Sequence, residues 1–175
     1  MGKIILFSGT HGVGKGCFLK ENSFEGIRVF TASELIKEFK QTEEDGYKQV
    51  ENVEDNQNIL LKALQIKYDR ENMTIILDGH LCLINKFNKI ERIPEGFFLN
   101  AKIKGIIILQ GNVPEIKNNL MKRDGQEWDA AFINMIQDEE KKYAEFLYDK
   151  YRIPFIVINN KCNNFKKVIA DILEM

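Results

Sequence analysis

A glycine-rich loop directly follows an apolar run near the start of the chain, and it constrains the fold more than any other feature. Residues 4–7 (IILF) have the apolar character of a buried strand, and glycines at positions 9, 12, 14 and 16 then surround Lys15. The spacing is GxxxxGK, which is typical of a phosphate-binding loop (P-loop) between a strand and a helix. A flexible glycine turn is the alternative, and the strand–loop–helix context disfavours it.

We expect this loop to hold the phosphates of ATP, because glycines let successive backbone N–H groups face phosphate oxygens. The following helix adds its positive dipole end, and Lys15 adds a full charge over the β- and γ-phosphates. The residues assigned to this cradle are Gly9, His11, Gly12, Val13, Gly14, Lys15, Gly16 and Cys17. His11 is expected to shape the loop. The Ser or Thr that usually follows the lysine and binds Mg²⁺ is absent, because Gly16 stands there.

Composition limits the class of protein. A chain of 175 residues is expected to form a single domain spanning 1–175, and its formal net charge of −1 gives no reason to expect a nucleic-acid or membrane partner. No apolar run approaches the roughly 20 residues that span a bilayer, and the first residues show no signal-peptide pattern. Cys17, Cys82 and Cys162 are scattered, as is typical of reduced cytoplasmic thiols. The oligomeric state is left open.

Apolar runs alternate with helical patterns along the whole chain. This alternation predicts an α/β fold of the P-loop NTPase type, with a five-stranded parallel sheet and helices on both faces. We expect strands at residues 3–8, 27–31, 74–77, 105–109 and 155–158. Helices are expected at 15–21, 114–123, 128–151 and 165–175; a further helix begins at residue 33, and residues 59–67 continue a helix to about residue 69. Residues 81–103 are expected to be irregular, apart from a short helical stretch that Pro94 begins. In the long helix, Phe132, Met135, Ile136, Glu139, Tyr143, Phe146 and Leu147 are expected to form a core-facing stripe.

Polar residues follow several of these strands at their carboxyl ends, where ligands bind in parallel sheets. Asp78 ends the apolar run at residues 74–77, as in a Walker-B type site, where the carboxylate holds Mg²⁺ directly or through water. An aspartate that caps a turn beside Gly79 is the alternative. His80 is either a hydrogen-bond donor or base for the acceptor, or a partly buried histidine bonded to backbone.

Further candidates lie outside the loop. Arg123 ends a helix and either stabilises the transferring phosphoryl group or complements the helix dipole. Arg92 is a weaker candidate on the irregular segment. Thr31 and Ser33 either bind an acceptor or cap the following helix, and capping is the default interpretation. The acidic residues 42–58 are interpreted as a solvated loop or helix face, with a mobile substrate flap as the alternative.

The loop GTHGVGKGC (residues 9–17) resembles the GxPGxGKGT loop of adenylate kinases and their relatives, which also have glycine at the position of Gly16. Similar pieces follow in the same order: a helix start at 31–35, an acid at Asp78, a short lid at about 123–128 and an Asn-rich turn at 159–161. The sequence DGH at 78–80 and the short lid are closer to the archaeal-type and nuclear adenylate kinases than to the common bacterial form. The resemblance implies an acceptor-binding region at about 31–70 and an adenine site at the backbone of the turn that contains Asn160.

The chain also departs from that family. Nucleoside-monophosphate kinases have arginines at the positions matching Ile36 and Cys82, and this chain has only five arginines, Arg28, Arg70, Arg92, Arg123 and Arg152. A monophosphate acceptor carries two negative charges that favour bidentate cationic partners. The leading hypothesis is therefore phosphoryl transfer from ATP·Mg²⁺ to a small acceptor, with a nucleoside monophosphate favoured. The alternatives are a kinase for another small metabolite and an ATP-binding regulatory module with little turnover.

Overall fold

The computed structural model describes residues 3–23, 25–42, 53–68, 74–125 and 127–175. Its main sheet has five strands in the order β2-β3-β1-β6-β7, and every neighbouring pair is parallel. These strands are β1 (Lys3–Ser8), β2 (Ile27–Thr31), β3 (Thr74–Asp78), β6 (Ile103–Gln110) and β7 (Phe155–Asn159). The predicted five-stranded parallel sheet is confirmed.

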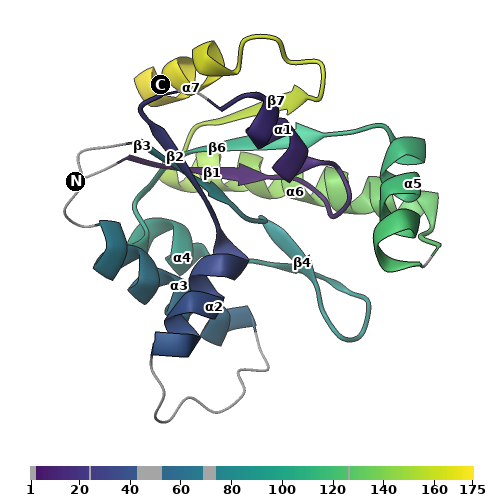
Figure 1. The fold of residues 1–175 in the computed structure, drawn as a ribbon, viewed down its shortest axis with the longest axis horizontal. Helices are drawn as coiled ribbons and strands as arrows, with labels where there is room; N and C mark the ends of the chain where they lie inside the picture. Colours follow the sequence, from purple (N-terminus) through teal and green to yellow (C-terminus); the bar gives the residue numbers. More distant parts are fainter. Residues whose placement is uncertain (1–2, 24, 43–52, 69–73, 126) are drawn as a thin grey trace.

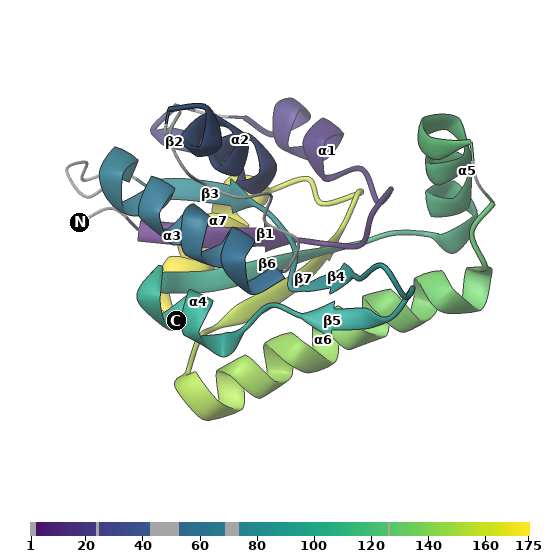
Figure 2. The same cartoon turned by 90° about the horizontal axis from the view of Figure 1, so that it is seen from below.

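Helices cover both faces of this sheet, as Figures 1 and 2 show. They are α1 (Lys15–Glu21), α2 (Ala32–Thr42), α3 (Val53–Tyr68), α4 (Glu95–Asn100), α5 (Val113–Asp124), α6 (Ala130–Tyr151) and α7 (Phe165–Glu174). Successive residues of a strand face opposite sides, so β1 contributes to two cores. Ile4 and Leu6 pack with residues of α3 and α4, whereas Ile5 and Phe7 pack with residues of α1, α5 and α7.

The prediction of irregular structure over residues 81–103 was partly wrong, because a small antiparallel hairpin lies there. It consists of β4 (Cys82–Ile84) and β5 (Ile90–Arg92), and it extends away from the main sheet (Figure 1). The Asn85 side chain closes the turn, since its Oδ1 accepts hydrogen bonds from the backbone N–H groups of Phe87 and Lys89. Strands of three residues are too short to show a hydrophobic period, so the pattern alone did not reveal them.

The predicted core stripe of α6 was also partly wrong. Its buried residues are Ile133, Ile136, Gln137, Glu140, Tyr143, Ala144 and Leu147. Glu139 lies on the outer side, where Arg92 binds its Oε1, and Glu140 takes the buried position instead. Polar groups are buried only where partners satisfy them, and those partners come from strand ends far away in the sequence.

Two further observations concern the chain as a whole. No helix in the described ranges is both long and apolar enough to cross a bilayer. The thiols of Cys17, Cys82 and Cys162 are all unpaired, as their scattered positions predicted.

Gly105 of β6 provides a test of the sheet–helix packing. A Cβ atom at this position would lie 2.6 Å from Cγ1 of Ile172 in α7. We expect Gly105→Ala to destabilise the protein by about 1–3 kcal/mol, because overpacking forces side chains or backbone to shift. Urea denaturation measures this loss. Gly96→Ala in α4 is the matched control, since the nearest atom to its new Cβ is 3.9 Å away. Equal unfolding free energies for the two variants would contradict the described packing.

Candidate active site

The loop between β1 and α1 is compact and closely supported. Gly12 and Gly14 have positive φ angles of 79° and 95°, which L side chains rarely adopt. A Cβ atom on Gly12 would lie 2.7 Å from Cγ of Leu120, so the loop packs directly against α5. Asn119 of α5 also donates a hydrogen bond of 2.9 Å from Nδ2 to the Gly12 carbonyl. This support favours a preformed cradle over a flexible glycine turn.

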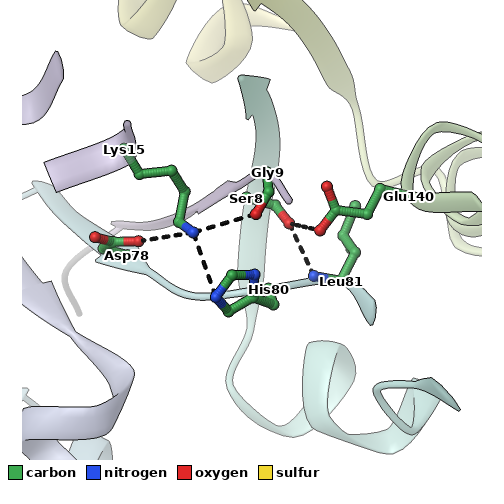
Figure 3. A network of polar contacts seen from close by, with 7 residues as sticks. All are labelled: Ser8, Gly9, Lys15, Asp78, His80, Leu81 and Glu140. Carbon is green, nitrogen blue, oxygen red and sulfur yellow. Dashed lines mark hydrogen bonds and ion pairs between the residues drawn. The ribbon is translucent and has the colours of Figure 1, made fainter. Parts of the chain in front are cut away.

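Lys15 stands at the mouth of the loop, and its ammonium group faces three partners (Figure 3). Its Nζ lies 3.2 Å from the Gly9 carbonyl oxygen, 3.3 Å from His80 Nε2 and 3.6 Å from Asp78 Oδ1. Burial lowers the pKa of Lys15, while the charge of Asp78 opposes that change. The ammonium is thus held between the start of the loop and the end of β3.

Asp78 ends β3 and pairs in register with Phe7 of β1 and Thr31 of β2. Burial raises the pKa of its carboxyl, and the nearby Lys15 opposes that rise. Mg²⁺ in nucleotide sites commonly takes one or two protein carboxylates together with phosphate oxygens and water. The described residues contain no cluster of three metal-ligating side chains. Asp78 fits the common pattern of one carboxylate that would hold Mg²⁺ together with the nucleotide, directly or through water.

His11 and His80 lie beside Lys15 with their ring centroids 4.3 Å apart. Burial and the charge of Lys15 lower the pKa of His11 to about 4 and lower the pKa of His80 well below its usual value. Both imidazoles are therefore neutral near pH 7. The Nδ1 atom of His80 is buried and has no hydrogen-bond partner among the described residues.

A cavity of about 440 Å³ opens next to this group. Lys15, Asp78 and His80 lie at its polar end. Its walls are mainly apolar and come from α2, α3, α4 and the hairpin, with Ile36 and Leu60 among them. The volume lies in the range of small-molecule sites, and the position at the carboxyl ends of β2 and β3 is where parallel sheets bind ligands.

Several predicted acceptor residues reach this cavity. Thr31 and Ser33 both line it, and Thr31 Oγ1 also accepts a hydrogen bond of 3.3 Å from the Glu34 N–H at the start of α2. Within the acidic stretch, residues 43–52 lie outside the described residues, but Asn56 and Gln57 of α3 contribute to the lining.

The remaining predicted residues do not line the cavity. Arg123 is exposed at the end of α5 and binds Asp124 through two contacts of 2.6 and 2.7 Å, yet its charge still contributes to the low pKa of His11. Arg92 bonds Glu139 and lies over the Tyr143 ring at 4.8 Å from its centroid. Asn160 is exposed after β7, with its Nδ2 3.4 Å from a carboxylate oxygen of Glu115.

The sequence interpretation missed four polar residues that support the site: Ser8, Asn119, Gln137 and Glu140. Gln137 and Glu140 are three residues apart on the buried face of α6, and they interrupt an otherwise apolar stripe. That interruption was the available signal, because buried polar groups need specific partners. Ser8 and Asn119 carried no comparable signal.

The comparisons with known proteins identify a family and a fold. The family described as AAA domain matches residues 8–150, and the chain therefore belongs to this family. Its fold is that of the P-loop NTPase kinases. A search of curated protein sequences finds no significant match.

Solved structures share the whole fold at low sequence identity. The tunicamycin resistance protein of Deinococcus radiodurans has a TM-score of 0.62 and 14% identity, with 99% of this chain and 95% of that chain covered. TT1252 from Thermus thermophilus has a TM-score of 0.55 and 14% identity, with 97% of each chain covered. At this identity the likeness concerns the fold alone.

The neutral histidines can be tested by NMR. We expect the His11 imidazole to titrate with a midpoint at about 4, because burial and Lys15 oppose its protonation. Side-chain ¹H–¹³C spectra recorded from pH 8 downwards measure this midpoint, and the urea-unfolded chain is the control, with an expected value near 6.5. A midpoint near 6.5 in the folded protein would show that His11 is not buried beside Lys15.

Proposed function

We propose that this protein transfers the γ-phosphoryl group of ATP to a small acceptor bound in the cavity. The observation that supports this best is the arrangement around Lys15: a closely packed glycine loop, an ammonium 3.6 Å from the Asp78 carboxylate, and a cavity beginning at the same point. The loop amides and Lys15 would hold the donor phosphates, and Asp78 would orient Mg²⁺. Bound Mg²⁺ supplies charge neutralisation on the phosphate oxygens.

The reaction forms one bond and breaks another at the γ-phosphorus. An acceptor oxygen bonds to this phosphorus, the bond to the β,γ-bridging oxygen breaks, and ADP leaves with the electron pair. A hydroxyl acceptor releases its proton to solvent in this step, whereas a phosphate dianion has no proton to release. The chain contributes positioning and charge, which supply most of the catalysis in phosphoryl transfer.

Two predicted elements complete the proposal. Arg123 lies in the last turn of α5, and α5 is tied to the loop through Asn119. We place Arg123 in a short lid at about 123–128, from which its guanidinium would exchange Asp124 for the transferring phosphoryl group. The adenine would lie near the turn after β7, held by backbone groups around Asn160, as in the adenylate kinases that the sequence resembles.

The acceptor has two candidate classes. The resemblance to adenylate kinases favours a nucleoside monophosphate bound in the region of residues 31–70. The described cavity lining favours a second class, a neutral hydroxyl compound, because Lys15 is its one cation and lies within 3.6 Å of Asp78. A phosphate dianion in an apolar cavity without paired cations would have a high desolvation cost.

Replacing Lys15 tests the donor site. We expect Lys15→Ala to lower the rate of ADP formation about 100-fold or more, since charge stabilisation of the transferring group contributes at this level. A coupled ADP assay with a panel of acceptors measures the rate. Lys20→Ala is the matched control, because Lys20 is exposed on the same helix. Equal rates for wild type and Lys15→Ala would reject the donor site. Tight ATP binding without acceptor-dependent turnover would favour the regulatory module.

Matched acceptor pairs separate the two acceptor classes. Each nucleoside is compared with its own monophosphate, so only the charge at the 5′ position differs. A cavity whose described lining has one cation is expected to give the higher kcat/KM with the neutral member. Proton release provides an independent readout, because phosphorylation of a hydroxyl group releases one proton and phosphorylation of a monophosphate dianion releases none. Faster turnover of the monophosphates would instead support the adenylate-kinase-like acceptor.

A further inference from the structure

Glu140 of α6 is a buried acid that the proposed reaction does not use. Glu140 is 1% exposed, and it is not among the residues that line the cavity. Its Oε1 atom accepts a hydrogen bond of 2.9 Å from Ser8 Oγ. Its Oε2 atom is buried and has no hydrogen-bond partner among the described residues. A buried charge with an unpaired oxygen is costly, so this carboxyl has a strong reason to hold a proton.

Ser8 connects Glu140 to two parts of the candidate active site, the start of the phosphate loop and the segment after β3 (Figure 3). It is the last residue of β1 and directly precedes Gly9, where the phosphate loop begins. Its Oγ atom also accepts a hydrogen bond of 2.8 Å from the backbone N–H of Leu81, which follows His80. One carboxyl group thus supports the start of the loop and, through the same hydroxyl, the segment that carries Asp78 and His80.

Neighbouring turns of α6 make similar connections. One turn earlier, Gln137 Oε1 accepts a hydrogen bond of 2.9 Å from the N–H of Gly111, which follows β6. One turn later, Tyr143 donates a short hydrogen bond from its hydroxyl to the Ile93 carbonyl, after β5. Glu140 is the member of this buried polar stripe that can carry a charge near pH 7. It is also the member joined to the phosphate loop.

We propose that Glu140 is a positioning residue for nucleotide binding, which braces the phosphate loop through Ser8 and takes up a proton when Mg·ATP binds. This inference rests on the proposed function, because it requires Mg·ATP to bind at the loop. The proton comes from solvent and converts the carboxylate to a carboxyl. The removal of this charge leaves the Ser8 hydrogen bond in place, since the protonated group still offers an acceptor oxygen.

The groups around Glu140 set the direction of this effect. Burial raises the pKa of Glu140 to about 7, and the charge of Lys15 on α1 opposes that rise. The hydrogen bond from Ser8 and the nearby backbone amides of Leu81 and Cys82 also lower this pKa. On the β4 side, the Cys82 thiol stays neutral because burial raises its pKa to about 12. His80, next to Lys15, is neutral because its pKa is well below its usual value. Lys15 is therefore the cation that stabilises the Glu140 carboxylate.

Mg·ATP would weaken that stabilisation. Its phosphates carry net negative charge to Lys15 and offset the ammonium, so protonation of Glu140 becomes more favourable in the complex. If Glu140 binds its proton more tightly in the complex, its pKa is higher there than in the free protein. Nucleotide affinity then falls as the pH rises above the pKa of the free protein. For a pKa difference of about one unit between complex and free protein, the affinity changes up to about tenfold.

Calorimetry of the full chain with Mg²⁺ and a non-hydrolysable ATP analogue tests the inference. Titrations in two buffers of different ionisation enthalpy give the number of protons taken up. We expect wild type to take up about half a proton near pH 7.5 and to lose up to about tenfold in affinity from pH 6 to pH 9 through this group. Glu140→Gln keeps an acceptor for Ser8 without the charge. Its proton uptake should therefore be about half a proton lower than that of wild type, and its affinity should lack the loss of up to about tenfold from pH 6 to pH 9 that Glu140 causes. The titration of the nucleotide itself contributes equally to both proteins.

Two further variants complete the design. Glu145→Gln makes the same chemical change on the exposed face of α6, and it should behave as wild type. Ser8→Ala removes the bridge, so it should weaken nucleotide binding several-fold while the proton uptake persists. Wild-type affinity in Ser8→Ala would overturn the bracing role.

The outcomes are separable from those of the proposed function. Absence of any nucleotide binding by wild type would reject the donor site itself. Nucleotide binding with equal proton uptake and equal pH dependence in wild type and Glu140→Gln would overturn only this inference. If Glu140→Gln does not fold, the wild-type measurement decides, and zero proton uptake between pH 7 and 8 would overturn it.

Discussion

The site depends on the placement of opposite charges in a partly buried space between the ends of β1 and β3. Lys15 lies 3.6 Å from Asp78, and burial shifts the pKa of each group toward its neutral form. Neither charge is well solvated, so each relies on the other in this structure. A triphosphate with Mg²⁺ is the type of ligand that satisfies both groups at once, because it offers anions to the lysine and a cation to the aspartate.

Packing around the loop keeps this arrangement in place. Gly12 fits against Leu120 of α5, and Asn119 holds the Gly12 carbonyl from the same helix. Helix α6 supports the strand ends through Gln137, Glu140 and Tyr143. The two helices α5 and α6 thus link the loop, the predicted lid region and the segment after β3. A residue far from the nucleotide can therefore affect its binding through contacts of backbone and buried side chains.

The parts of the structure that local sequence determines were predictable. The strand before the loop, the glycine-rich loop itself and Asp78 at the end of β3 all follow from short patterns whose physical reasons are local. The hairpin β4–β5 was not predictable, because strands of three residues have no measurable period. The buried position of Glu140 was also missed, because its partner Ser8 is 132 residues away in the chain. Helical spacing alone selected Glu139, which instead bonds Arg92 on the surface.

Hydrogen–deuterium exchange of the loop amides tests the central claim most directly. If residues 9–17 form a cradle for the phosphates, saturating Mg·ATP should slow the exchange of the amides from Gly12 to Cys17, while the exposed hairpin around Phe87 should be unaffected. Slowing should require the phosphates, so adenosine alone should leave the exchange of these amides unchanged. Unchanged exchange of the loop amides at saturating Mg·ATP would contradict the account.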